Sequence, residues 1–146
     1  MGAHPWHYLV PYDPNLGKAL AELREREFAA GRYNPVEPFP RFPVDPRQAP
    51  GGKHPTVDAA RQAAGASGTR SILDMLGISL KPTPGVVTPL DEDDLTDVFS
   101  TLEPTRDHLE DDEALFEMIA RGHGVSFVVY ANGLPSEICF AGYSYD

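Results

Sequence analysis

Two apolar, β-rich runs close the chain, and they constrain its fold more than any other feature. The runs cover residues 125–131 and 137–143, and the connection 132–136 begins with Asn-Gly. Asn-Gly between such runs is a strong hairpin signal, and five connecting residues predict a loop longer than the two-residue kind. The first run is apolar on both faces, as in a covered, central strand. We therefore expect a C-terminal β-hairpin at the centre of a small antiparallel or mixed sheet.

The remaining patterns predict an α+β fold in which four or five helices pack against that sheet. Residues 6–10 favour a strand. A helix is expected to begin after Asn15 and to end near Ala30, with Gly31 as its C-terminal glycine. Further segments show helix-start and helix-end signals or short apolar runs between prolines. The expected helices are 57–64, 70–76, 89–102 and 111–121, and the expected short strands are 78–80 and 86–87.

Thr88-Pro89 is predicted to start the best-marked of these helices. Proline suits the first helical position, and Asp91 follows Thr88 by three residues, close to a capping box. An apolar stripe at helical spacing is expected to be buried. The stripe consists of Leu95, Val98, Phe99 and Leu102.

A proline-rich segment, 35–55, interrupts the chain with seven prolines in 21 residues. Proline lacks the N–H that helices and strand ladders need, which predicts an extended segment. Because Phe39, Phe42 and Val44 lie among the prolines, we expect it to run along the surface with those side chains tucked in. The 34 residues before it are too few to bury a core alone, so the chain is expected to be one domain, 1–146.

Negative charge is concentrated in one stretch of the chain. The net charge is −10, from 22 acids and 12 bases, and residues 91–117 hold twelve acids and one base, Arg106. This charge disfavours general nucleic-acid or membrane binding, and we expect a basic protein surface as the partner. The alternative is that the acids only cap helices. The expected partner-binding residues are Asp91, Glu92, Asp93, Asp94, Asp97, Glu110, Asp111, Asp112 and Glu113.

Composition adds further expectations about the setting of the protein. No apolar run approaches the roughly 18 residues that cross a bilayer. A single cysteine, Cys139, forms no internal disulfide, and the first residues lack the pattern of a secretion signal. A cytoplasmic, bacterial-type protein without a cofactor is expected.

Glu27 is the sharpest local anomaly, because it continues the apolar stripe of the first helix. Either an arginine pairs with it (Arg24, Arg26 or Arg32), or it acts as a general base or ligand-binding group. If the strands that carry His7 and His123 are neighbours, these imidazoles, Glu27 and Arg32 are candidates for one pocket able to move protons. No His or Cys spacing supports a metal site.

Two weaker candidates remain. Glycines and hydroxyls before a predicted helix are able to hold an anion through backbone N–H groups, although a turn between two short helices is the favoured explanation of the same residues. These anion-binding candidates are Ser67, Gly68, Thr69 and Arg70. Cys139 is either a buried apolar residue or, beside His7 or His123, a nucleophile.

Three functions follow from these patterns. The first is a non-catalytic interaction module, resembling immunity, antitoxin or inhibitor proteins in its charge, which docks a basic partner. The second is a small enzyme or ligand-binding protein with a pocket lined by His7, Glu27, Arg32 and His123. The third is an accessory subunit in which the segment 35–55 is a docking arm.

Overall fold

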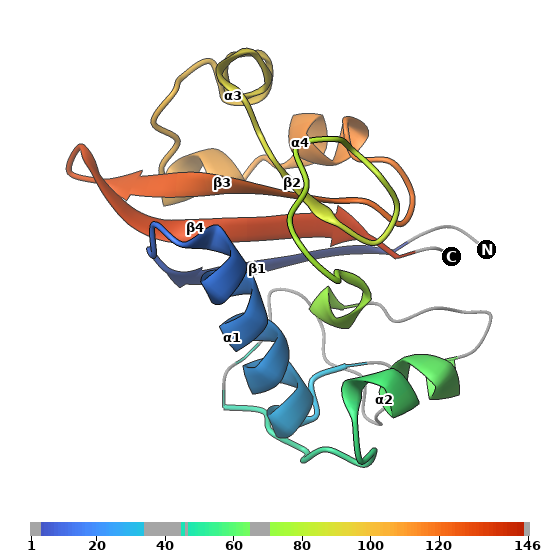
Figure 1. Ribbon diagram of the computed structural model, residues 1–146. Coiled ribbons are helices and arrows are strands. Elements are labelled where there is room, and N and C mark those ends of the chain that lie inside the picture. Colours follow the sequence, from blue (N-terminus) through green and yellow to red (C-terminus); the bar gives the residue numbers. More distant parts are fainter. Residues whose placement is uncertain (1–3, 34–44, 46, 65–70, 145–146) are drawn as a thin grey trace.

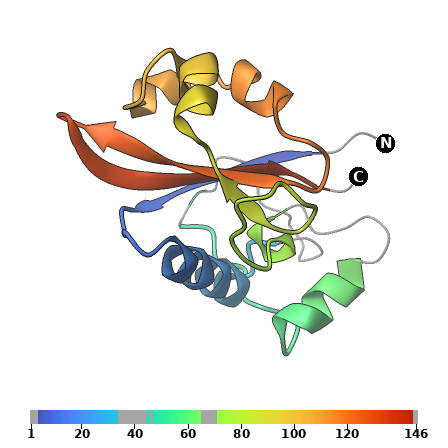
Figure 2. The ribbon, with the colours of Figure 1, turned by 45° about the horizontal axis from the view of Figure 1, so that its top comes forward.

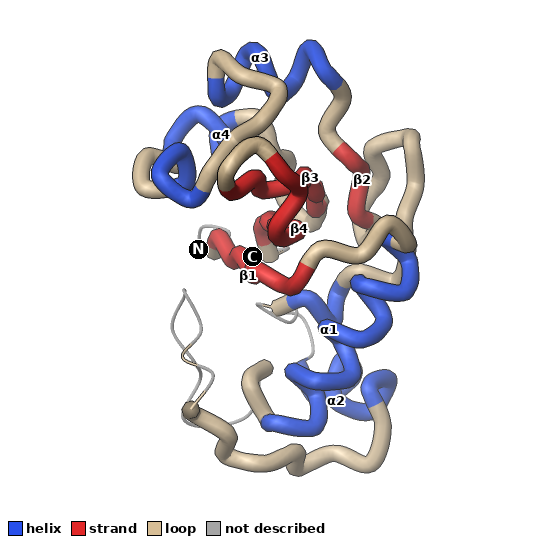
Figure 3. The backbone as a smooth tube through the Cα atoms, turned by 90° about the vertical axis from the view of Figure 1, so that its left-hand side faces the viewer, coloured by secondary structure: helices blue, strands red, loops and turns tan. Residues whose placement is uncertain are grey.

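A computed structural model describes residues 4–33, 45, 47–64 and 71–144, which form an α+β fold in three layers (Figure 1). The middle layer is a four-stranded sheet in the order β1-β4-β3-β2. Helices α1 and α2 cover one face and α3 and α4 the other, as the turned views also show (Figure 2, Figure 3). The strands are β1 Pro5–Pro11, β2 Val87–Pro89, β3 Gly124–Ala131 and β4 Leu134–Tyr143. The α-helices are α1 Leu16–Ala30, α2 Val57–Ala64, α3 Glu92–Phe99 and α4 Glu113–Glu117.

The predicted C-terminal hairpin is confirmed, and it occupies the centre of the sheet. Strand β4 lies between β1 and β3 and is antiparallel to both, whereas β2 runs parallel to β3, so the sheet is mixed. The expected long loop is wrong. Ala131 pairs with Leu134, which leaves only Asn132 and Gly133 in the turn, with φ of 54° and 76°. Positive φ at both positions is the type I′ geometry that Asn-Gly favours.

Alternation along the strands produces two cores, one on each face of the sheet. Trp6, Tyr8 and Val10 of β1 are buried toward α1, while Phe127 and Val129 of β3 are buried toward α3 and α4. Successive side chains of a strand point to opposite faces, so the central strand β4 contributes to both cores. The first core adds Leu20, Leu23, Ile138 and Phe140, and the second adds Phe99, Leu115, Cys139 and Ala141.

Helix α1 has the caps that its sequence predicts. The Asn15 side chain accepts a hydrogen bond from the Lys18 N–H at 3.0 Å, and Gly31 ends the helix with φ of 78°. A Cβ at Gly31 would collide with the backbone of Gly51, so glycine is needed there for both conformation and space. This contact brings the later part of the proline-rich segment against the end of α1.

Several predicted elements differ in the structure. Thr88 and Pro89 belong to β2 and pair with β3, so α3 begins later, at Glu92. Parallel pairing with a buried strand outweighs the local helix-start signal. The expected helix 70–76 is reduced to a 3₁₀ turn, Ile72–Asp74, and the expected strand 78–80 to one bridge between Ile78 and Val87. Residues 35–44 and 46 of the proline-rich segment lie outside the described residues.

Candidate functional site

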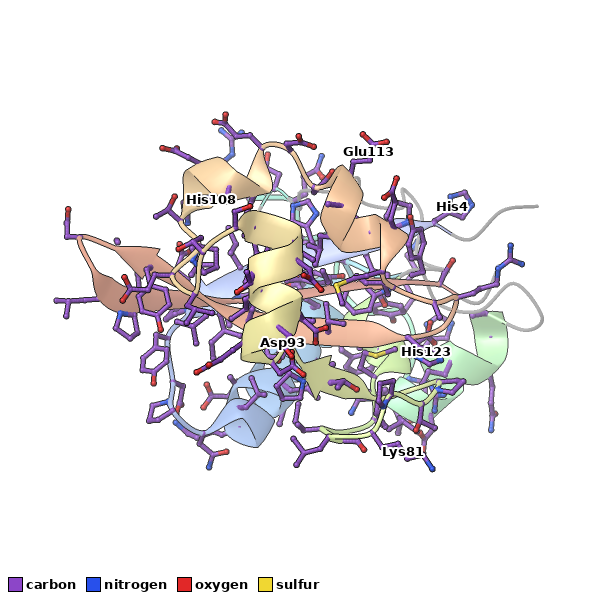
Figure 4. All side chains as sticks on the ribbon, turned by 90° about the horizontal axis from the view of Figure 1, so that it is seen from above. His4, Lys81, Asp93, His108, Glu113 and His123 are labelled. Carbon is purple, nitrogen blue, oxygen red and sulfur yellow. The ribbon has the colours of Figure 1, made fainter. Side chains whose placement is uncertain are left out.

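An acidic layer covers one face of the sheet. It consists of α3, the 3₁₀ helix Arg106–Leu109 and α4. Figure 4 looks down on this layer, with Asp93 at the beginning of α3 and Glu113 at the beginning of α4. We call the predicted partner-binding carboxylates of this layer the acidic face; seven are exposed and two partly buried. The acidic face comprises Asp91, Glu92, Asp93, Asp94, Asp97, Glu110, Asp111, Asp112 and Glu113.

No base within the described residues forms a salt bridge with any of the twelve acids of the stretch 91–117. The one base of that stretch, Arg106, is paired with an acid outside it. Its Nε and Nη2 atoms donate to the two carboxylate oxygens of Glu137, each at 2.6 Å. The negative charge of the layer is therefore left without compensation from the described part of the chain.

Helix capping accounts for only a small part of this charge. Asp91 and Asp94 form a reciprocal capping box in which the Asp94 N–H donates to Asp91 Oδ1 at 2.8 Å and the Asp91 N–H donates to Asp94 Oδ2 at 3.3 Å. Glu92, Asp93 and Glu113 lie in the first turns of their helices, where the helix dipole favours acids. Asp107 likewise lies in the first turn of the 3₁₀ helix, and the other six of the twelve acids have neither role.

The two halves of the chain differ sharply in charge. Residues 1–90 contain ten bases and eight acids, a net charge of +2. Residues 91–146 contain two bases and fourteen acids, a net charge of −12. Because α1 and α2 lie on one side of the sheet and α3 and α4 on the other, the molecule is electrostatically polarised across the sheet (Figure 1).

A mostly apolar groove opens beside the acidic face. It has a volume of about 280 Å³ and lies where the starts of α1 and α3 approach β3. Tyr12 and Leu102 in its lining are 41% and 45% exposed, unusual for large apolar side chains. The lining also includes Asp13, Leu16, Leu90, Leu95, Ser126, Val128 and Tyr130.

Glu27 and Arg32 are brought together, as a buried ion pair. Both Arg32 Nε and Nη2 donate to the Glu27 carboxylate, and Arg26 Nε adds a bond of 3.2 Å. Arg32 Nη1 donates to the Gln48 carbonyl at 3.0 Å. The Glu27 carboxylate raises the pKa of Arg32, which keeps this guanidinium charged. The pair thus ties the end of α1 to the chain that follows it, as the structural interpretation of the sequence predicts.

Tyr8 joins the same buried region from β1. Burial raises the pKa of the Tyr8 phenol well above its usual value, and the nearby Glu27 carboxylate raises it further. The phenol is therefore neutral over the whole physiological range.

The structure does not bring His7 and His123 to Glu27. His7 points from β1 to the α4 side of the sheet, where Asp112 is its charged neighbour, whereas Glu27 packs beneath the opposite face with Tyr8. Burial lowers the pKa of His7, and Asp112 partly opposes this effect. His123 precedes β3 in a tight connection, where its N–H donates to the Ala120 carbonyl at 3.0 Å and its carbonyl accepts from Tyr143.

Of the two weaker candidate sites, the structure describes Cys139 but not the anion-binding residues. Cys139 is fully buried in β4, and burial raises the pKa of its thiol to about 12, with Glu137 and Asp112 adding to the effect. A thiol with this pKa is not a nucleophile at neutral pH. The anion-binding candidates Ser67, Gly68, Thr69 and Arg70 lie outside the described residues.

Comparisons with known proteins gave no assignment: family models, curated proteins and solved structures yielded no match to this chain. Among the described residues, no three His, Cys, Asp or Glu side chains are grouped to hold a metal ion. No helix in that part of the chain has the length and apolarity needed to span a membrane.

The groove was not predicted from the sequence. Leu102 is expected in the buried stripe of a helix, but α3 ends at Phe99 and Ser100 takes the left-handed conformation (φ 59°), which leaves Leu102 exposed. The other lining residues come from four separate segments of the chain. Only the exposed apolar pair Tyr12 and Leu102 marks the site, and exposure is not readable from sequence.

Proposed function

We propose that this protein is a non-catalytic interaction module that binds a basic protein surface through its acidic face, in the manner of an inhibitor or an immunity-like partner. The observation that supports the proposal most directly is the absence of described salt bridges to twelve acids within 27 residues. Such surplus charge destabilises a fold through self-repulsion, and a cationic partner relieves that repulsion on binding.

The position of the charge supports the same proposal. The acids all come from the one layer that covers this face of the sheet, with Asp93 and Glu113 at the beginnings of its two α-helices (Figure 4), so they present one field to a partner instead of surrounding the molecule. A one-sided field accelerates association with an oppositely charged surface and makes binding sensitive to salt. The partner is therefore expected to carry Lys and Arg over a surface as broad as this layer.

Two matched triple variants test the proposal. The first is Glu92→Gln/Asp93→Asn/Asp97→Asn, which removes three exposed charges from the acidic face and leaves the capping box intact. The control is Glu22→Gln/Glu25→Gln/Asp58→Asn, which removes three exposed charges from the α1 and α2 layer. Each tagged protein is used to isolate partners from the native host, which are identified by mass spectrometry and then purified for affinity measurements.

The two outcomes are distinct. A basic partner should bind the wild type and the control with similar affinity, should bind the acidic-face variant at least several-fold more weakly, and should be released as salt is raised toward 0.5 M. The proposal is contradicted if the natural partner binds both variants with equal affinity. It is also contradicted if the affinity does not change with salt concentration.

A further inference from the structure

We infer that the groove beside the acidic face receives one bulky apolar side chain of the partner, carried in a segment whose flanking residues are Lys or Arg. This inference rests on the proposed function and deepens it, because it specifies the partner segment. The groove and the acidic face meet at the start of α3, where Leu90 and Leu95 line the groove and Asp91 and Asp94 adjoin them in the chain.

The size and lining of the groove determine what fits it. Its volume of about 280 Å³ is below the roughly 300–1,000 Å³ of pockets that hold cofactors or drug-sized molecules. Tyr12, Leu102 and Val128 supply apolar contacts, and the exposed surfaces of the first two are lost from water only when the groove is filled. An aromatic or leucine side chain meets these requirements.

Charge at the rim determines what flanks that side chain. Asp13 lines the groove, and Asp91, Asp94 and Glu103 are the chain neighbours of its lining residues Leu90, Leu95 and Leu102. Lys18 Nζ forms a salt bridge of 3.2 Å with the Asp13 carboxylate. No described base lines the groove itself. A second copy of this chain would offer at most its residues 1–90, with a net charge of only +2, so charge complementarity favours a strongly basic segment of another protein.

The edge of β3 adds a backbone feature to the groove. The Leu90 N–H donates to the Ser126 carbonyl at 2.9 Å, and the Tyr130 N–H donates to the Pro104 carbonyl at 2.7 Å. Val128 lies between them, and residues two apart in a strand direct their backbone groups to the same side. Because β2 ends at Pro89, opposite Ser126, no described strand continues beside Val128. Its N–H and C=O are positioned to hold the inserted segment.

Two peptides test the inference by NMR titration of the isotope-labelled protein at 20 mM salt. One is acetyl-Lys-Lys-Trp-Lys-Lys-amide, and the other replaces its tryptophan with alanine. The tryptophan peptide should bind about tenfold or more tightly, because it buries a large apolar side chain. It alone should shift the amide signals of Leu90, Leu102 and Val128.

Two matched leucine variants test whether the tryptophan side chain of the peptide binds in the groove. Leu102→Ala should reduce the preference for tryptophan to about twofold, since it removes one apolar wall of the groove. Leu134→Ala, at an exposed leucine that begins β4 outside the groove, should leave the preference unchanged. Neither substitution removes a buried side chain, so both proteins should fold.

Other results overturn the inference. Equal binding of the two peptides, with shifts confined to the acidic face, rejects the groove and leaves the proposed function standing. Failure of both peptides to bind rejects both proposals. A dimer in sedimentation that Leu102→Ala disrupts would assign the groove to a second copy and reject the partner segment.

Discussion

At the scale of single residues, the chain contains one buried ion pair on which the N-terminal half depends. Glu27 and Arg32 are 0% and 4% exposed and bond one another through two nitrogen atoms of the guanidinium group. Removing one member leaves the other charge buried without a partner, which is far costlier than losing a surface contact.

Glu27→Ala is therefore expected to lower the free energy of unfolding by about 3–5 kcal/mol, measured by urea denaturation. Glu25→Ala is the matched control, because Glu25 is exposed on the same helix, and it should change stability by less than about 0.5 kcal/mol. Equal effects of the two substitutions would show that the pair has no special structural role.

Cys139 offers a second test at this scale. Burial raises the pKa of its thiol to about 12, so the folded protein should react with iodoacetamide very slowly at pH 7.5 and fully only in urea. Mass spectrometry of the alkylated protein gives the reacted fraction. Fast reaction of the native protein would contradict a thiol buried in the core between the sheet and the acidic layer.

The partly buried His7 side chain should make the free energy of unfolding depend on pH under mildly acidic conditions. Its pKa is lowered below 6.5 by burial, so the folded protein holds this ring neutral while the unfolded chain binds a proton. Its contribution to stability is complete above pH 6.5 and is lost as pH falls toward the lowered folded pKa. The free energy of unfolding is measured in urea at pH 8.0 and 5.5. The difference between the two values should be smaller in His7→Gln and larger in Asp112→Asn than in the wild type. An unchanged profile in both variants would contradict this assignment.

At the scale of elements, local signals succeed wherever nothing competes with them. Asn15 and Gly31 mark the ends of α1, and Asn132-Gly133 marks the hairpin turn, because each residue satisfies a backbone requirement of its own segment. Thr88-Pro89 carries an equally good helix-start signal, yet it pairs with β3. Sheet pairing is a tertiary effect, and the local sequence does not contain it.

Helix α3 consequently depends on the later cap at Asp91. Asp91→Ala should lower the free energy of unfolding by about 1 kcal/mol, because it removes the carboxylate that accepts the hydrogen bond of the Asp94 N–H in the capping box. Asp97→Ala removes one charge from the same helix without touching the cap and should have a smaller effect. Thermal unfolding separates the two variants, and a reversed order would place the start of the helix elsewhere.

At the scale of the whole molecule, the sheet separates a nearly neutral half from a strongly acidic one. The charge excess is visible in the sequence, but its location on a single layer follows from the chain crossing the sheet between α2 and α3 (Figure 1). The groove could not be predicted from the sequence for the same reason. Its walls come from β2, β3, β4, the segment 12–16 that leads into α1, and residues in and beside α3, which only the tertiary fold brings together.

The most direct test of the account is the salt dependence of binding to a decalysine peptide, measured by fluorescence anisotropy between 20 and 300 mM salt. As salt rises, the wild type and the Glu22→Gln/Glu25→Gln/Asp58→Asn control should lose affinity for the peptide steeply and to the same extent. The variant Glu92→Gln/Asp93→Asn/Asp97→Asn should bind the peptide more weakly at 20 mM salt, and its affinity should fall less as salt rises. If both triple variants weaken binding equally, only net charge matters. The claim of a dedicated acidic binding face would then be contradicted.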